Sequence, residues 1–235
     1  GRERAAGMQN KSGTKMPENM AGCSLAAFTL PAHYVGGDFY EVIPFSLDKI
    51  GICIGDISGK GVPAAIFMSN VRSCLRYEAL KHCFPDALIS DINKTIYKES
   101  VKGMFCTLFY CLVDIKEKKI FYTSAGHDEQ VIYNPGNGMV TFLKTKGIPI
   151  GVKENADYEV KSYDYNPGDI LLLFTDGLIE QNQSKTLDLQ DILQIFNNNQ
   201  NTDVKVIIDK IKLMHNNILE GQNADDDTTC LIAEL

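Results

Sequence analysis

Aspartates stand at four places in this sequence where an apolar, strand-like run meets a glycine, a threonine or another acid. These acids are Asp38, Asp56, Asp176 and the consecutive Asp225, Asp226 and Asp227. A carboxylate carried toward a protein core costs several kcal/mol unless a partner offsets its charge. Carboxylate oxygens suit Mg²⁺ and Mn²⁺, whereas the sequence shows no paired His or Cys cluster suited to structural zinc. Acids at several strand ends therefore predict a two-metal site, in which an activated water attacks a phosphoryl group and no protein nucleophile is needed.

The elements that must position these acids are predicted from apolar periodicity and turn residues. We expect strands at 23–30, 34–45, 49–57, 104–115, 119–125, 129–134, 139–143, 170–174 and 228–235. We expect helices at 62–80, 85–98, 187–196 and 204–219, the first of them burying Ile66, Val71, Leu75 and Leu80. Helices inserted between antiparallel hairpins indicate an α+β fold rather than a βαβ repeat.

Composition limits the class of protein. The 235 residues are 44% apolar, which predicts one domain over 21–235 preceded by a linker or the end of another helix at 1–20. The net charge of −7 argues against a nucleic-acid or anionic-membrane surface. Seven scattered cysteines without a CxxC pair, no signal-peptide pattern and no apolar run near 18 residues favour the reducing cytoplasm.

Other interpretations of these motifs remain open at this point. An aspartate beside glycine is most often a turn or cap residue. The run Gly59-Lys60-Gly61-Val62-Pro63-Ala64 fits the dinucleotide fingerprint G-x-G-x-x-A, but the acid about twenty residues on, Glu78, falls inside a predicted helix. The run Gly36-Gly37-Asp38-Phe39 resembles the hairpin signature of diguanylate cyclases, although the glutamate between Asp and Phe is absent.

A more specific resemblance comes from seven motifs that follow one another through nearly the whole chain. They are Pro31-Ala32 with 35–40, 55–65, 104–110, Ser124-Ala125-Gly126-His127, 147–152, Gly168-Asp169 with Thr175-Asp176-Gly177, and Asp226-Asp227-Thr228-Thr229. In this order they resemble the metal-dependent protein phosphatase family of type 2C, in its bacterial SpoIIE/RsbU-like branch. The resemblance implies two packed antiparallel sheets flanked by helices, a four-layer αββα arrangement.

The same resemblance implies the ligands of two Mn²⁺ or Mg²⁺ ions. Asp56 would bridge them, Asp38 and the Ile57 carbonyl would serve one, and Asp176 and Asp226 the other, with Asp227 as second choice to Asp226. Asp56 and Asp226 would thereby hold the attacking water that bridges the ions. The reaction implied is hydrolysis of phosphoserine or phosphothreonine on a protein, usually an anti-sigma factor antagonist in this branch. The chain would then be the output domain of a signalling protein whose sensor precedes residue 1.

Some positions depart from the family or stay ambiguous. Ser58 stands where eukaryotic relatives carry a phosphate-site histidine, so no general acid is assigned. Lys60 and the backbone at Gly59 are candidates to meet the phosphate, but a turn built for the following helix explains them equally well. His127 is expected to be a packing or hydrogen-bonding residue rather than a catalyst. A non-catalytic metal-binding or partner-docking module of the same fold is the alternative function.

Further departures concern the loops around the site. Asp128-Glu129 replaces the prolines that are common after His127 in the family. The family's glycine-bearing segment after Glu180 is shortened into 181–185.

Overall fold

The computed structural model describes residues 22–32, 36–99, 103–179, 187–200, 202–219, 224 and 226–235. Four predictions lie outside these residues. They are the linker or helix end at 1–20, the motif residue Val35, the shortened loop 181–185, and the candidate ligand Asp225.

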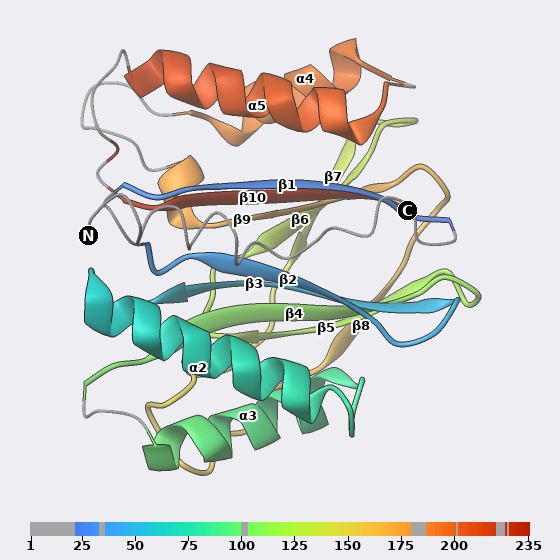
Figure 1. Ribbon diagram of the computed structural model, residues 1–235. Coiled ribbons are helices and arrows are strands. Elements are labelled where there is room, and N and C mark those ends of the chain that lie inside the picture. Colours follow the sequence, from blue (N-terminus) through green and yellow to red (C-terminus); the bar gives the residue numbers. More distant parts are fainter. Residues whose placement is uncertain are drawn as a thin grey trace.

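Ten strands in the described residues form two five-stranded sheets that pack face to face (Figure 1). The first sheet has the order β1 (Ser24–Leu30), β10 (Thr228–Glu234), β9 (Ile170–Phe174), β6 (Gln130–Asn134) and β7 (Met139–Leu143). The second sheet has the order β2 (Phe39–Pro44), β3 (Lys49–Ile57), β4 (Cys106–Asp114), β5 (Lys119–Ala125) and β8 (Lys161–Asp164). Neighbouring strands in both sheets pair antiparallel.

Pairs of helices cover the two outer faces. Helices α4 (Leu189–Asn198) and α5 (Val204–Leu219) lie over the first sheet, and α2 (Val62–Glu78) and α3 (Pro85–Glu99) lie over the second (Figure 1). The predicted four-layer α+β fold is therefore confirmed. The dinucleotide interpretation is wrong, because both neighbours of β3 in the sheet run antiparallel to it and no parallel crossover follows the glycine-rich turn.

Strand β9 shows how this layering follows from the sequence. Leu171 and Leu173 pack into the core between the sheets. Ile170, Leu172 and Phe174 pack into the core beneath α4 and α5. Since successive side chains of a strand point to opposite faces, a strand buried on both faces must be apolar throughout. The apolar run therefore ends where the layers end, and Thr175 and Asp176 follow immediately.

Two details of the predicted elements are wrong. The prediction omitted β8, because Lys161–Asp164 is a short, mostly exposed and polar edge strand without an apolar pattern. The buried face predicted for the helix 62–80 is only half right: Val71 and Leu75 are fully buried, but Ile66 is 58% exposed. Leu80 lies beyond the end of α2 and is 84% exposed. The helix instead turns Phe67 and Met68 toward the second sheet.

The cysteines form no disulfide within the described residues. All seven are free, and five of them are buried. In the described part of the chain, no helix is both long and apolar enough to span a membrane.

Candidate active site

The candidate acids meet at one end of the seam between the two sheets. In β3 the alternation that buries Ile52 and Ile54 in the inter-sheet core carries Asp56 to the same face. Asp38 immediately precedes β2, which is antiparallel to β3, so its start lies beside the end of β3. Asp176 follows β9 and Asp226 precedes β10 in the other sheet, where the same antiparallel rule brings them together.

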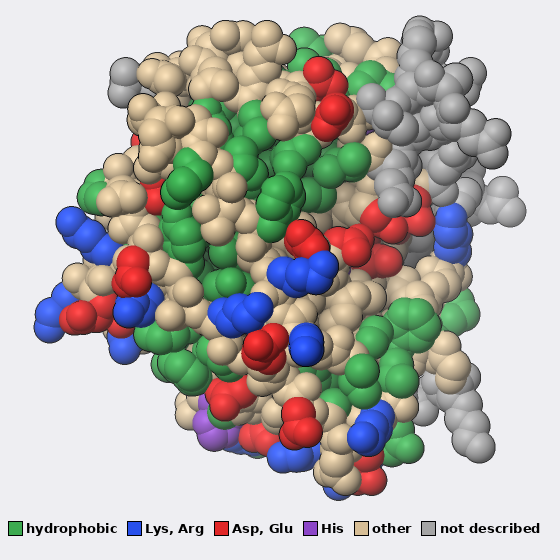
Figure 2. Space-filling view, turned by 180° about the vertical axis from the view of Figure 1, so that it is seen from behind, with side chains coloured by type: hydrophobic (Ala, Val, Ile, Leu, Met, Phe, Trp, Pro, Cys, Tyr) green, Lys and Arg blue, Asp and Glu red, His purple; other side chains and the backbone are tan. Residues whose placement is uncertain are grey.

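Figure 2, the view from behind, shows acidic side chains gathered at the right, with a basic side chain nearby. This is the end that lies at the left in Figure 1.

Asp38 and Asp56 are close neighbours from adjacent strands of the second sheet. Asp38 is 4% exposed, and its side chain lies close enough to that of Asp56 for the two carboxyl groups to shift each other's pKa. The turn before β2 approaches the end of β3 so tightly that a Cβ at Gly37 would stand 3.0 Å from the Ile57 carbonyl oxygen and 3.3 Å from Asp56 Oδ1. The Ile57 carbonyl therefore faces the same small region as the two carboxylates.

Thr175 ties this pair to the first sheet. Its hydroxyl donates to Asp38 Oδ2 at 2.5 Å and accepts from the Thr229 amide at 2.9 Å. Asp176, the next residue, begins a 3-10 turn (Asp176–Leu178) in which its Oδ1 accepts from the Gly177 amide at 2.8 Å. The motif Thr175-Asp176-Gly177 thus supplies a cross-sheet bond as well as an acid.

The two described terminal acids have different surroundings. Asp227 is 9% exposed, and its two oxygens accept from the amides of Ala32 at 2.8 Å and Gly37 at 2.5 Å. Asp226 is exposed, lies 3.8 Å from Lys60 Nζ through Oδ1, and accepts from the Asp227 amide through the same oxygen. Asp227 therefore fastens the loop before β2, whereas Asp226 faces the opening of the site.

Burial and the charges of neighbouring acids raise the pKa values of Asp38 and Asp56. Burial first, and the Asp56 charge second, raise the pKa of Asp38 well above its usual range. Burial, followed by the charge of Asp176, raises the pKa of Asp56 to about 6, and the charges of Asp226 and Asp227 act in the same direction. Carboxylates that disfavour each other's ionisation in this way are typical of sites that take a proton or a cation.

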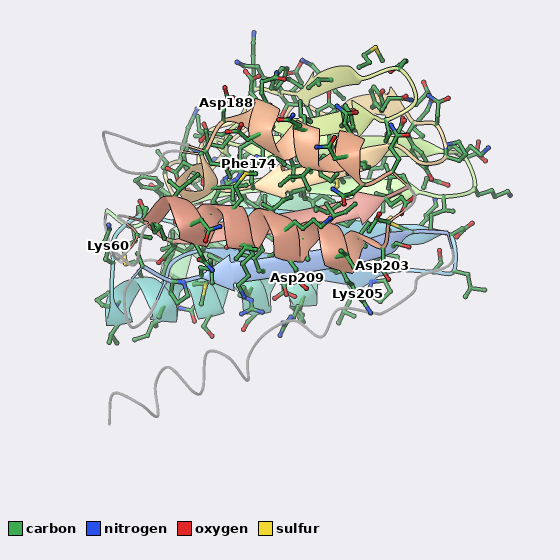
Figure 3. All side chains as sticks on the ribbon, turned by 90° about the horizontal axis from the view of Figure 1, so that it is seen from above. Lys60, Phe174, Asp188, Asp203, Lys205 and Asp209 are labelled. Carbon is green, nitrogen blue, oxygen red and sulfur yellow. The ribbon has the colours of Figure 1, made fainter. Side chains whose placement is uncertain are left out.

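A cavity of about 270 Å³ lies at the bend that follows β3, lined by Ser58, Gly59, Lys60, Pro63, Ala64, Gly103 and Met104. Gly59 and Gly61 have positive φ values of 94° and 80°, which bend the chain between β3 and α2. Lys60 reaches from this bend toward Asp226, and Figure 3 shows it at the edge of the molecule. The structure thus places Lys60, a predicted phosphate-contacting residue, beside the predicted metal acid Asp226.

The residues present fit divalent ions by their chemistry. The donors are carboxylates and one backbone carbonyl, the hard oxygen ligands that Mg²⁺ and Mn²⁺ prefer. Among the described residues, no salt bridge involves Asp38 or Asp56. In that same part of the chain, no three acidic, histidine or cysteine side chains stand close enough to surround one ion together. Several carboxylate oxygens instead accept hydrogen bonds from Thr175, Gly177 or neighbouring amides.

His127 is confirmed as a hydrogen-bonding residue. Its Nδ1 lies 2.9 Å from Thr107 Oγ1, and its Nε2 lies 3.3 Å from the Phe174 carbonyl oxygen. Burial lowers the pKa of this histidine to about 4, so the ring is neutral near physiological pH. The sequence prediction missed Thr175, Thr107 and Gln130 as partners around the site. Thr175 and Thr107 lie within matched motifs, but no sequence pattern pairs them with Asp38 or His127.

The comparisons with known proteins agree with this geometry. Residues 46–235 match the family model described as stage II sporulation protein E (SpoIIE). The chain belongs to the SpoIIE family. Proteins of this family depend on Mn²⁺ or Mg²⁺ in general.

Among proteins of known sequence, the chain is 26% identical over 227 residues to phosphoserine phosphatase RsbU of Bacillus subtilis, covering 95% of this chain and 66% of RsbU. It is 30% identical over 177 residues to Protein IcfG of Synechocystis, covering 64% of this chain and 28% of IcfG. The chain thus spans less than two thirds of the length of either relative.

Among solved structures, the SiaA-PP2C domain of Pseudomonas aeruginosa superimposes with a TM-score of 0.86 at 17% identity, covering 100% of this chain and 95% of that domain. This likeness shows that the SpoIIE-family chain has the fold of type 2C phosphatase domains.

Proposed function

We propose that this chain is a Mn²⁺- or Mg²⁺-dependent serine/threonine phosphatase that hydrolyses phosphoserine or phosphothreonine on a regulatory protein. The observation that carries the proposal is the meeting of Asp38 and Asp56 from one sheet with Asp176 and Asp226 from the other, where burial and mutual repulsion raise the pKa values of Asp38 and Asp56. Membership of the SpoIIE family and the similarity to phosphoserine phosphatase RsbU support this reaction.

In this proposal Asp56 would help to hold both of two ions. Asp38 and the Ile57 carbonyl would help to hold one, and Asp176 and Asp226 the other. Asp226 is preferred over Asp227 because the Asp227 oxygens already bind two loop amides. Two bound divalent ions would acidify a water so that it attacks phosphorus near neutral pH, and would stabilise the charge that develops in the transition state.

The chain's own cationic and backbone groups would orient the phosphate. Lys60 places a positive charge at the opening of the site, beside the exposed Asp226. The cavity that Gly59 and Lys60 line is suited to receive the phosphoryl group next to the acids. A lysine acts there as a point charge that attracts the substrate and offsets the negative charge gathered by the carboxylates.

The substrate we propose is a phosphorylated protein resembling an anti-sigma factor antagonist, the usual substrate in the branch that the sequence motifs resemble. We further propose that 21–235 is the phosphatase domain, that 1–20 links it to a sensor domain, and that the protein acts in the cytoplasm. The free cysteines support a reducing compartment. The partial coverage of RsbU and IcfG supports a longer full-length protein.

The test is hydrolysis of p-nitrophenyl phosphate and of a phosphoserine peptide by the purified chain. Activity should require Mn²⁺ or Mg²⁺. Asp56→Asn should lower kcat by about a thousandfold or more, because it removes the carboxylate that would serve both ions. That loss corresponds to about 4 kcal/mol of transition-state stabilisation. Asp164→Asn, which changes an exposed acid on the edge strand β8, is the matched control and should retain activity.

Two results would refute the proposal. Robust activity in EDTA would exclude the metal mechanism. No Mn²⁺ binding at millimolar concentration, measured by calorimetric titration of folded protein, would favour the non-catalytic docking module.

A further inference from the structure

The ring of His127 connects the two sheets directly behind the acids. Its Nε2 faces the Phe174 carbonyl oxygen at 3.3 Å in β9 of the first sheet. Its Nδ1 faces Thr107 Oγ1 at 2.9 Å in β4 of the second sheet. The contacts are separated by 47 and 20 residues in sequence, so they are tertiary contacts rather than local turns.

The chemistry of the two partners fixes which nitrogen carries the proton. A carbonyl oxygen can only accept, so Nε2 must be the N–H donor to Phe174. A neutral ring has one acceptor nitrogen, and Nδ1 therefore accepts from the Thr107 hydroxyl. The ring is neutral because burial lowers its pKa to about 4. Thr107, His127 and Phe174 thus form one directed chain of hydrogen bonds.

Both ends of this chain lie next to candidate metal ligands. Thr107 is paired directly with Asp56 across the β3–β4 ladder, and directly paired residues carry their side chains on the same face of a sheet. Phe174 is the last residue of β9, two positions before Asp176. The ring therefore spans from the partner of Asp56 to the strand end that delivers Asp176.

His127 is itself held rigidly. The Ser124 hydroxyl donates to the His127 carbonyl at 2.7 Å and accepts from its amide at 3.0 Å. Gly126 turns the chain at φ 70°, and a Cβ there would stand 2.6 Å from Pro149. The motif Ser124-Ala125-Gly126-His127 therefore fixes the backbone position from which the His127 ring projects.

Gln130 reinforces the same end of β9. Its side-chain carbonyl accepts from the Phe174 amide at 2.7 Å, and its side-chain amide donates to the Phe174 carbonyl at 3.1 Å. Gln130 is fully buried. The register between β6 and β9 runs from Val131 to Tyr133, so this side chain continues the pairing where the backbone ladder stops.

We propose that His127 is a positioning residue that sets the separation between the two halves of the acidic site, Asp38 and Asp56 on one sheet and Asp176 and Asp226 on the other. It acts through Thr107 and Phe174 and does not touch substrate or ions. This inference rests on the proposed metal-dependent function. Residues that orient ligands in this way commonly change metal affinity ten- to a hundredfold when altered.

The first test measures Mn²⁺ binding to folded variants by calorimetric titration. His127→Leu removes both hydrogen bonds and should weaken Mn²⁺ affinity roughly tenfold. His127→Gln keeps a donor for the Phe174 carbonyl and should therefore lose less Mn²⁺ affinity than His127→Leu. Thr107→Val keeps the shape of the side chain and should weaken affinity by a few-fold. The double variant Thr107→Val/His127→Leu should bind no more weakly than His127→Leu alone, because Thr107 acts through the ring.

Thr123→Val is the control for the loss of a threonine hydroxyl, because it removes a buried hydroxyl that donates to the Glu159 carbonyl at 2.7 Å, away from His127. It should lower the unfolding midpoint without changing Mn²⁺ affinity more than twofold. If His127 had a purely structural role, its variants would also lower the unfolding midpoint and leave the Mn²⁺ affinity unchanged. If His127→Leu fails to fold, the Mn²⁺ affinities of His127→Gln and Thr107→Val decide the question. The proposal is overturned if both variants, like Thr123→Val, keep the Mn²⁺ affinity within twofold of wild type.

The second test needs no metal. Long-range ¹H–¹⁵N correlation spectra of the metal-free chain at pH 7 should show His127 neutral and protonated on Nε2. A charged ring, or one protonated on Nδ1, would overturn the directed chain of hydrogen bonds. A wild-type chain that binds no Mn²⁺ would overturn both this inference and the proposed function, whereas normal binding by wild type and every variant would overturn only this inference.

Discussion

Two buried carboxylates lie three residues apart at the start of β2, and the protein treats them differently. Glu41 is 2% exposed, and it accepts from Arg72 Nε at 2.6 Å and from Arg76 Nη2 at 2.8 Å, both from α2. Asp38 is 4% exposed, yet its neighbours are the Thr175 hydroxyl and the carboxylate of Asp56. The fold can thus supply cations to a buried acid on the helix side of β2.

Glu41 and Asp38 differ in the charge that faces each carboxylate, and this difference separates a structural acid from a candidate metal ligand. Glu41 points toward α2 and is offset by protein charge, so its burial contributes to holding the helix on the sheet. Asp38 points into the seam between the sheets, where the charge of Asp56 raises its pKa further. A buried carboxylate that faces another carboxylate is stabilised by a proton or by a cation from solution.

The largest expected effect on stability concerns the paired acid. Glu41→Gln weakens the hydrogen bonds that Arg72 and Arg76 donate to a buried charged acceptor, and it should lower the free energy of unfolding by about 2 to 3 kcal/mol. The measurement is urea denaturation of the metal-free chain. Glu154→Gln, which changes a 46% exposed acid 3.9 Å from Lys98, should change stability by less than about 1 kcal/mol. A loss below about 1 kcal/mol for Glu41→Gln would contradict the comparison.

The unpaired acid should respond in the opposite direction. Asp38→Asn removes a buried charge that repels Asp56 while keeping an oxygen that can accept from Thr175, so the metal-free chain should gain about 1 kcal/mol of stability. The same substitution should weaken Mn²⁺ affinity by about tenfold or more. Urea denaturation and calorimetric titration measure the two effects. Destabilisation of the metal-free chain would show that Asp38 is a structural acid like Glu41.

The smallest effect is a dependence on pH. The pKa of Asp56 is raised to about 6 in the folded chain, above its ordinary value of about 3.9 in an unfolded chain. The folded state therefore binds more protons between those values, and the contribution of Asp56 to stability, complete below about pH 4, is lost as pH rises through 6. His127 acts in the opposite sense: its pKa is lowered to about 4, so its contribution is present above about pH 6.5 and lost as pH falls toward 4.

Comparing wild type with Asp56→Asn isolates the contribution of Asp56. In metal-free buffer, wild type should lose stability relative to the variant as pH rises from 4.5 to 7. Free energies of unfolding at those two pH values provide the measurement. A difference that does not change with pH would mean that Asp56 is not held near its neighbouring acids.

The sequence predicted the acids and the layers for physical reasons that are local. Apolar runs that end at Asp56 and Asp176 mark where buried strands leave the core, and the order of the motifs identified the fold. Alternation along a strand points neighbouring side chains to opposite sides, and Asp226 and Asp227 accordingly have different partners.

Long-range partners were beyond the sequence. Nothing in the chain pairs Glu41 with arginines 31 and 35 residues away, or His127 with a carbonyl 47 residues away. The face of α2 was mistaken because periodicity alone does not say how a helix rotates on its sheet, and Ile66 faces outward while Phe67 and Met68 face the sheet.

The division of the acids between two sheets has a consequence for any measurement of stability. An ion that takes ligands from both sheets at once binds the folded chain and has no equivalent site in the unfolded one. By mass action it would add about 2.7 kcal/mol at a free concentration one hundred times its Kd. The melting temperature would then rise with the logarithm of the Mn²⁺ concentration, and the chain would report the divalent-ion content of its solution through its own unfolding.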